Sequence, residues 1–485
     1  MRINLQVVAF ANGIALCGLA LAMCIPLLYD IILLRRNLIE VFLPSAIICL
    51  FLGVSTILSF KSSNTEISSL TRQDAFLIVS SLWIIISIFS SFPFYFYDGI
   101  KLSFISSFFE ATSGITTTGA SIYQNVEILP RTLNLWRFVL HFIGGIGIVA
   151  IGIVAFPLMK IGGMQLFLAE NSDKSQKLFP RVSQIAGFFV GTYIAIIGFF
   201  TILLKSSGMG LFDSICHSIS AISTGGFSTR NLGIQYYNSS LIEFIILCAM
   251  FMGGITFLEI IKGLKTRGKG SLQNQQIRGY FKLTSMVVLI SLLFLFIRYN
   301  TNISMRIITD SAFNIISAIT TTGLVLQNET LSFFKEPCVK ICIFVLAMIG
   351  GCSGSTTGGI KIFRIQILYS LFKNYINKLS NPFNAEMPKY QTKKIEETLI
   401  TSIISFLFLL FLSFTFSTIL ITITSNVSAS LAVSAVISCL FNLGYNIDYE
   451  VISPVSKIIL SIDMIIGRLE IIPIVAIFSK SFWKK

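Results

Sequence analysis

The sequence predicts an all-α polytopic membrane protein, in which two additional transmembrane helices precede four repeats of helix, pore loop and helix around a pseudo-fourfold pore. Three observations predict this fold. Of the 485 residues, 54% are hydrophobic and 12% are charged, whereas soluble domains carry about 25% charged residues. Apolar stretches long enough to cross about 30 Å of hydrocarbon recur along the whole chain. A short semi-polar segment ending in a glycine turn recurs four times between them.

The first two apolar stretches, at roughly 4–34 and 39–60, predict the additional helices, and we assign residues 1–73 to them. The stretch from Val7 to Leu34 is too long for the apolar core of a signal peptide. We therefore expect it to be retained as a transmembrane helix.

The rest of the chain divides into four units, which we place at 74–180, 181–279, 280–395 and 396–485. The short segment of each unit has too few residues to span a bilayer, so we expect a half-helix that enters the membrane and an extended strand that returns. Non-helical backbone is tolerated at that depth only where it is buried in protein or lines a water-filled cavity. Four loops that face one axis satisfy this condition together.

The four short segments repeat residue by residue. They align on Gly119, Gly226, Gly323 and Gly444. Six positions earlier stand Ser113, Ser220, Ser317 and Ser438, and two positions earlier stand Thr117, Thr224, Thr321 and Asn442. Several columns in register indicate an internal repeat. The alternative is that the glycines only let helices pack closely, which explains one loop better than four aligned ones.

The glycine turns have the composition of an ion filter. Such a filter needs backbone carbonyls that point to one axis in place of the ion's hydration shell, and glycine permits this because it tolerates φ > 0. The negative end of each half-helix dipole would favour a cation. The predicted filter residues are Thr117, Thr118, Gly119, Thr224, Gly225, Gly226, Thr321, Thr322, Gly323, Asn442, Leu443 and Gly444.

A second feature is a glycine-rich break at 350–359 in the closing segment of the third unit. It contains Gly350, Gly351, Ser353, Gly354, Ser355, Thr356, Thr357, Gly358 and Gly359. Each glycine costs a helix up to about 1 kcal/mol relative to alanine, so we expect a loop that closes the inner pore or moves aside. The alternatives are a kinked packing helix and, less well supported, a phosphate-binding loop, because Ile360 stands where that motif needs lysine.

Arg468 interrupts the apolar run of the last unit. Charges at such depth are costly and usually functional, and neither Asp463 nor Glu470 shares its helical face. We predict that Arg468 faces the pore below the filter, bonds the 350–359 loop and acts as an electrostatic barrier to cations. The alternative is that its side chain snorkels to the membrane interface.

Charge predicts the orientation of the chain. If every loop enters from outside, nearly all of the net charge of +14 falls on the cytoplasmic face, as the positive-inside rule requires. We therefore expect a protein of the cell's inner membrane, with both termini in the cytoplasm. Arg35 and Arg36 are exceptions, because they fall outside.

Three acidic residues, Glu110, Asp213 and Asp310, flank the predicted outer mouth. They either concentrate cations at the entrance or stand near half-helix N-termini.

The segments 109–120 and 223–230 resemble the first and second pore loops of the Trk/Ktr/HKT superfamily of potassium transporters, and the two additional helices resemble its TrkH branch. The fourth loop departs from the threonine-rich pattern, as the last repeat of that family does. The resemblance implies potassium uptake, a homodimer and a cytosolic Rossmann-type nucleotide-binding regulatory subunit (TrkA-like). It also implies that the 350–359 loop is the gate. The implied K⁺ ligands are Thr117, Thr118, Thr224, Gly225, Thr321, Thr322, Asn442 and Leu443.

Two other function classes compete with a channel-like transporter. A coupled secondary transporter, such as a symporter using Na⁺ or H⁺, also uses repeats and broken helices but predicts inverted repeats, whereas these four run in the same order. A membrane-embedded enzyme lacks a catalytic constellation, and two histidines with no HExxH motif give little support to a metalloenzyme. We expect no covalently bound cofactor, K⁺ as the transported ion, membrane lipid as a partner, and no nucleic acid.

Overall fold

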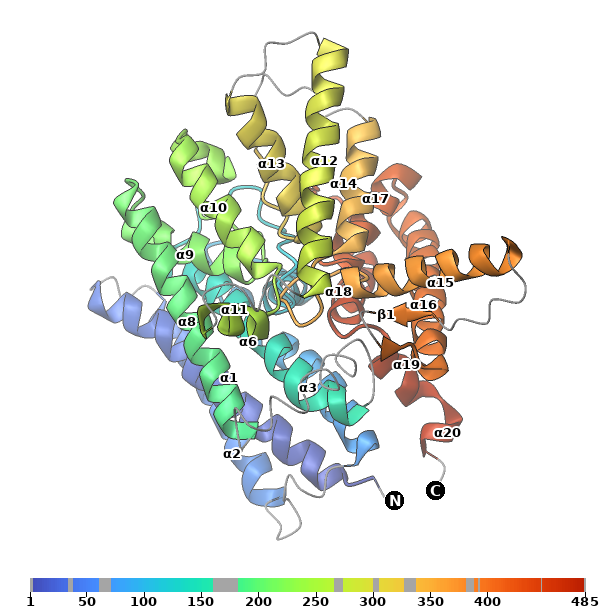
Figure 1. Ribbon diagram of the computed structural model, residues 1–485. Helices are drawn as coiled ribbons and strands as arrows, with labels where there is room; N and C mark the ends of the chain where they lie inside the picture. The colour runs from blue at the N-terminus through green and yellow to red at the C-terminus, as the bar shows by residue number, and fades with distance from the viewer. Residues whose placement is uncertain are drawn as a thin grey trace.

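Helices dominate the computed structural model of the chain (Figure 1). It describes residues 3–33, 38–60, 71–159, 182–265, 274–299, 305–326, 337–380, 388–390, 393–445 and 447–483. Among them, six helices are long and apolar enough to cross a membrane: Leu5–Ile32, Ile39–Phe60, Arg72–Tyr95, Gly187–Ser206, Gln275–Ile297 and Glu397–Ser425. Arg35 and Arg36, which the charge pattern does not fit, lie outside the described residues.

The two additional helices, α1 (Leu5–Ile32) and α2 (Ile39–Phe60), pack against each other. Their backbones approach closely where two glycines face: a Cβ on Gly13 would lie 3.0 Å from the carbonyl oxygen of Gly53. Helix α1 also packs on helices α3 and α6 of the first unit, so the pair flanks that unit.

The four units follow in order. The first holds α3 (Arg72–Ser90), α4 (Phe92–Tyr95), α5 (Phe104–Ile115) and α6 (Arg131–Met159). The second holds α8 (Val182–Ser206), α9 (Leu211–Ile222), η2 (Gly233–Tyr237), α10 (Ser240–Gly253) and α11 (Phe257–Lys265). The third holds α12 (Gln275–Tyr299), α13 (Met305–Ile319), α14 (Pro337–Ile349), α15 (Ile362–Ser380), β1 (Lys389–Tyr390) and β2 (Lys393–Lys394). The fourth holds α16 (Glu397–Ser425), α17 (Ala429–Leu440), α18 (Pro454–Arg468), α19 (Ile472–Phe478) and α20 (Lys480–Trp483). The exact boundaries between the units stay a prediction.

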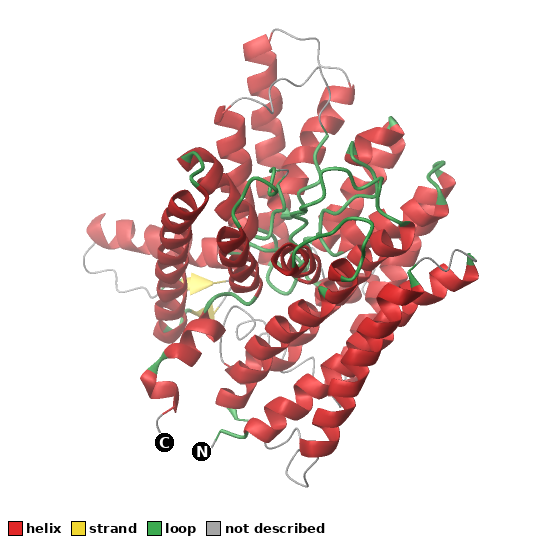
Figure 2. Ribbon diagram, turned by 180° about the vertical axis from the view of Figure 1, so that it is seen from behind, coloured by secondary structure: helices red, strands yellow, loops and turns green. Residues whose placement is uncertain are grey.

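Helices α5, α9, α13 and α17 are the predicted half-helices. Serine caps begin two of them: the Ser103 hydroxyl accepts from the amide of Ser106 at 3.2 Å, and Ser428 does the same for Leu431 at 3.4 Å. Each half-helix ends inside the molecule, and the loops that follow meet at the centre of the helix bundle (Figure 2). The bundle therefore surrounds these four loops.

Both ends of the described chain contact the first turn of α3. The Asn4 amide donates to Asp74 at 2.8 Å, and the Gln73 side chain donates to the Phe482 carbonyl at 2.7 Å. The N-terminal and C-terminal segments therefore lie on the same side of the molecule (Figure 1). Strands β1 and β2 form a short antiparallel hairpin, with Lys389 opposite Lys394.

Candidate functional site

The four loops leave their half-helices in the same way. In each, the backbone carbonyl of the aligned serine accepts a hydrogen bond from the amide of the residue before the loop glycine, at 2.8 or 2.9 Å. The pairs are Ser113 with Thr118, Ser220 with Gly225, Ser317 with Thr322 and Ser438 with Leu443. We number these loops 1 to 4 in chain order. The repeat read from the sequence is therefore a repeat in backbone geometry.

Each loop contains two residues in the left-handed region. The glycines have φ of 83°, 81°, 79° and 63° in loops 1 to 4, as the sequence predicted. The residues two positions earlier also have positive φ: 52° at Thr117, 53° at Thr224, 52° at Thr321 and 53° at Asn442. Sequence reasoning missed this at the three threonines, because a β-branched residue rarely adopts that conformation, whereas asparagine tolerates it. Left-handed residues that alternate with ordinary ones let successive carbonyls point to the same side, which a regular strand does not allow.

The loops close into a ring. In each loop the glycine faces the carbonyl oxygen of the residue before the next glycine: Gly119 faces Gly225, Gly226 faces Thr322, Gly323 faces Leu443 and Gly444 faces Thr118. A Cβ on any of these glycines would overlap that oxygen. The side-chain amide of Asn442 also donates to the Thr118 hydroxyl at 2.8 Å, which joins loop 4 to loop 1. The structure thus brings all twelve predicted filter residues together around one axis.

A cavity of 440 Å³ opens on the glycine side of this ring. All four loop glycines line it, together with Arg137, Arg230 and Asp448 from the surrounding segments. The glycines therefore share one water-accessible space and are not scattered among separate helix contacts.

Residues 350–361, which we call the inner loop, separate α14 from α15, so the predicted helix break is present. Its Thr356 hydroxyl lies 3.0 Å from the Ile222 carbonyl and 3.1 Å from the Gly253 carbonyl. Its Gly358 amide donates to the Thr321 hydroxyl at 2.7 Å, and a Cβ on Gly358 would overlap the Phe441 carbonyl oxygen. The inner loop thus contacts loops 2, 3 and 4 where they leave their half-helices, on the side of the ring away from the glycines and the cavity.

Arg468 is 3% exposed and stands at the end of α18. Its guanidinium donates to the carbonyl of Thr356 in the inner loop, as the sequence predicted, and to the Gly144 carbonyl at 3.3 Å. Gly144 belongs to α6, so Arg468 links the fourth unit, the inner loop and the first unit. Glu470, two positions on, pairs instead with Arg364 at the start of α15.

Sequence reasoning missed a second row of glycines in the closing helices. A Cβ on Gly144, Gly253 or Gly467 would clash with a carbonyl oxygen at the end of the preceding half-helix, of Ile115, Ile222 and Leu440 respectively. Small residues let backbones approach closely, so these glycines seat each half-helix against its closing helix. The available signal was one glycine at a similar place in each closing segment.

The three acidic residues do not form an exposed entrance, because all are buried. Asp213 stands in the first turn of α9, as the half-helix alternative expected, and accepts from Thr229 at 2.8 Å and Arg230 at 3.1 Å. Glu110 lies in the middle of α5 and is ion-paired, which neither alternative foresaw. In the segment outside the membrane-spanning helices, burial and then the Asp213 carboxylate raise the pKa of Tyr237.

Known proteins match nearly the whole chain. The family described as "TrkH: Cation transport protein" matches residues 39–296 and 306–485. The Trk system potassium uptake protein TrkG of Escherichia coli K12 is 31% identical, over 99% of both chains. TrkI of Halomonas elongata is 29% identical, over 96% of this chain and 94% of its own. The crystal structure of the potassium transporter TrkH from Vibrio parahaemolyticus is 24% identical and has a TM-score of 0.89, over 99% of this chain and 100% of that one. The predicted fold is confirmed.

Proposed function

The chain belongs to the TrkH family of cation transport proteins, and on that premise we propose that it carries potassium ions into the cell through the ring of four loops. It is a multi-pass membrane protein, and its family is one of transporters. The observation that carries the proposal is the closed cycle of glycines and carbonyls, which gives four equivalent loops one axis and one outer cavity.

The ion is held by oxygens of the two residues that precede each loop glycine. Backbone carbonyls on one axis replace the hydration shell of a cation, and the half-helices direct their negative ends toward it. Glycine at all four positions favours K⁺ over Na⁺, because family members with serine at the first tend to accept sodium. A symporter is the alternative, but the four units run in the same order, whereas coupled transporters are commonly built from inverted repeats.

The inner loop and Arg468 form the gate. The loop contacts loops 2, 3 and 4 on the side away from the cavity, and Arg468 holds its backbone from the first and fourth units. The loop blocks the path while these contacts last, and the arginine charge repels cations below the filter. Opening requires that the loop leave these partners.

The outer cavity faces the cell exterior, so both termini face the cytoplasm, in agreement with the positive-inside pattern. The relatives are named as proteins of a Trk system. By family resemblance, this chain forms a homodimer and is controlled by a cytosolic nucleotide-binding subunit of the TrkA type.

Expression of the chain should restore growth of a bacterium deficient in potassium uptake on limiting potassium. The regulatory subunit is expressed with it, and membrane insertion is verified by immunoblot. Gly119→Asp and Gly323→Asp serve as inactive controls, because a side chain at either position displaces a neighbouring carbonyl. Failure of the inserted wild-type chain to restore growth would contradict the assignment.

Thr356→Val should increase leak through the unstimulated protein. Valine has nearly the same shape but lacks the single hydroxyl hydrogen that Thr356 shares between the carbonyls of Ile222 and Gly253. Each buried hydrogen bond contributes about 1 kcal/mol, so the open population should rise roughly tenfold for each ~1.4 kcal/mol lost. Rb⁺ uptake into vesicles without the regulatory subunit measures this.

Thr415→Val is the matched control for that measurement, because the Thr415 hydroxyl bonds only its own helix on an exposed face of α16. An equal leak in both variants would mean that Thr356 does not hold the gate.

A further inference from the structure

One position in each half-helix, nine residues before the loop glycine, faces the strand that returns from the filter. The four occupants are Glu110, His217, Asn314 and Ala435. They differ in kind, from a carboxylate through an imidazole and an amide to a methyl group. We call them the peg residues, because the side chains of three of them contact the segment that follows the glycine of their own loop.

The pegs of loops 1 and 3 make the same hydrogen bond. A carboxylate oxygen of Glu110 accepts from the Ile122 amide at 2.9 Å, and the amide oxygen of Asn314 accepts from the Leu326 amide at 2.9 Å. Ile122 and Leu326 each stand three residues after the loop glycine. The peg thus fixes how far the returning strand lies from its half-helix.

The pegs of loops 2 and 4 differ from this pattern. His217 lies 3.0 Å from the hydroxyl of Ser228, two residues after Gly226. Ala435 has no polar atom, and the Tyr449 hydroxyl instead donates to Ser438 at 2.8 Å within the fourth unit. Among the four peg residues, only Glu110 of loop 1 is a carboxylate, and loop 4 has no polar peg residue.

Arg137 from α6 extends the charged peg to a second loop. Its Nε donates to Glu110 at 2.8 Å and its Nη2 to the Ser121 hydroxyl at 3.0 Å, both in unit 1. Its Nη1 lies 3.4 Å from the Ser228 carbonyl in loop 2, and its Cζ lies 3.9 Å from the centre of the Phe227 ring. Arg137 and Glu110 are 1% and 0% exposed.

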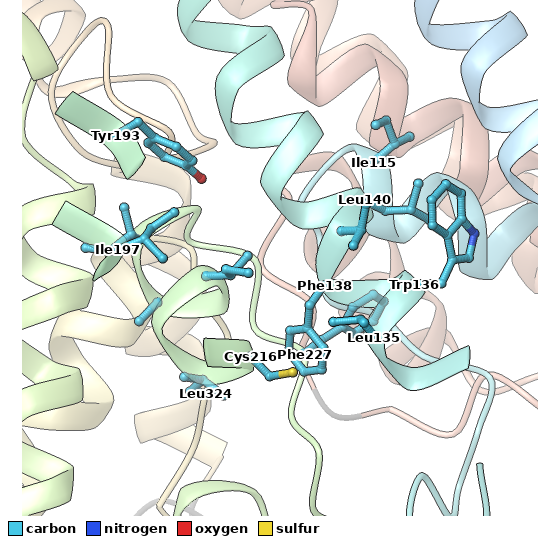
Figure 3. Packing of buried hydrophobic residues seen from close by; sticks show 14 of the residues in the cluster. Ile115, Leu135, Trp136, Phe138, Leu140, Tyr193, Ile197, Cys216, Phe227 and Leu324 are labelled. Carbon is cyan, nitrogen blue, oxygen red and sulfur yellow. The ribbon is translucent and has the colours of Figure 1, made fainter. Parts of the chain in front are cut away.

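Phe227 follows the loop 2 glycine directly and points into the core toward Phe138 and Cys216 (Figure 3). The His141 ring stacks on the Phe227 ring, with ring centres 4.3 Å apart, and fills the space where a Cβ of Gly225 would lie. Arg137 therefore contacts the ring of Phe227, which stands two residues after Gly225. Because Gly225 is a predicted ion ligand, a shift of Phe227 would move that ligand.

We propose that Glu110 and Arg137 form a specificity-determining positioning pair, which sets the spacing of the loop 1 and loop 2 carbonyls and thereby the preference for K⁺ over Na⁺. Neither side chain touches the ion. The spacing and stiffness of the carbonyl ring discriminate between cations of different size. The pair links the loop 1 and loop 2 quarters of that ring through buried charge. The inference rests on the proposed function of the loops.

The test compares the double variant Glu110→Gln/Arg137→Gln with the wild type in Rb⁺ uptake competed by Na⁺. The double variant leaves no unpaired buried charge, and glutamine keeps an oxygen for the Ile122 amide. We expect the K⁺/Na⁺ ratio to fall about tenfold, which corresponds to ~1.4 kcal/mol, while the maximal rate stays within about threefold because the conducting loops are retained. Arg137→Lys keeps the positive charge but lacks the branched guanidinium that reaches both loops. Its K⁺/Na⁺ ratio should therefore lie between those of the wild type and the double variant.

The outcomes separate this inference from the proposed function. If the wild-type chain carries no Rb⁺, the proposed function fails. If it does and the double variant keeps the wild-type ratio with a lower maximal rate, the pair is merely structural and the inference is overturned. Should the double variant not insert, the single variant Arg137→Lys replaces it, because it keeps the buried charge beside Glu110. In that case Arg137→Lys tests the pair itself: its ratio should fall below the wild-type value, and an unchanged ratio overturns the inference. Glu243→Gln, at a buried carboxylate in the first turn of α10, is the control.

Discussion

Replacing Gly226 by alanine should reduce potassium uptake to the level of cells that lack the transporter. Gly226 has φ of 81°, and alanine in that region costs about 1–2 kcal/mol. The larger effect is steric, because the new Cβ would overlap the carbonyl oxygen of Thr322 in the next loop. That oxygen is one of the proposed K⁺ ligands, so the substitution acts directly on the ion path. Rb⁺ uptake at saturating concentration is the measurement.

Gly198→Ala is the matched control for Gly226→Ala. Gly198 lies inside α8, where a Cβ would meet nothing within 4 Å. Alanine favours a helix interior by up to about 1 kcal/mol over glycine, so this variant should insert and transport as the wild type does. Substantial uptake by Gly226→Ala at normal expression would show that the ring in this structure is not the conducting ring.

Arg468→Gln should raise potassium flux through the chain in the absence of its regulatory subunit. A fixed positive charge about 8 Å from a passing cation, at an effective dielectric constant of about 20, adds about 2 kcal/mol to the barrier. Removing that charge should increase the rate roughly 30-fold. The arginine also holds the Thr356 carbonyl, so its loss favours release of the inner loop in the same direction. Initial Rb⁺ influx into proteoliposomes checks this.

Arg468→Lys separates the two effects. Lysine keeps the charge but is a single point donor, unable to bridge the Thr356 and Gly144 carbonyls as a guanidinium does. If the charge is the barrier, Arg468→Lys keeps flux low; if the link to the inner loop dominates, it resembles Arg468→Gln. Unchanged flux in both variants would remove Arg468 from the gate.

The sequence predicted the repeat, the half-helices, the helix break and the contact of Arg468 with the inner loop. These features are periodic or depend on local composition: an aligned glycine or a run such as 350–359 has the same meaning wherever the helices lie. The positive φ of Thr117, Thr224 and Thr321 could not be read this way, because threonine disfavours that conformation. Closure of the ring imposes that conformation, and such strain persists where the surroundings determine it.

The peg residues illustrate a second limit of sequence reasoning. Glu110 and Arg137 stand 27 positions apart on different helices, and no single-sequence pattern links them. The sequence places Glu110 near the mouth as an acidic residue, but its burial and its partner decide its role, and both are properties of packing. A comparison of all four residues nine positions before the glycines would have identified the position, although not the contacts.

The cycle of loops closes within one polypeptide, since loop 4 completes it against loop 1. If the proposed function holds, a single subunit contains a whole permeation route, and the proposed homodimer contains two. A cell that makes both intact and inactive subunits should therefore lose uptake in proportion to the inactive share. In a channel whose pore lies between subunits, one damaged subunit would instead inactivate the pore that it shares with intact subunits. For this protein, a defective gene copy should therefore be recessive to an intact one.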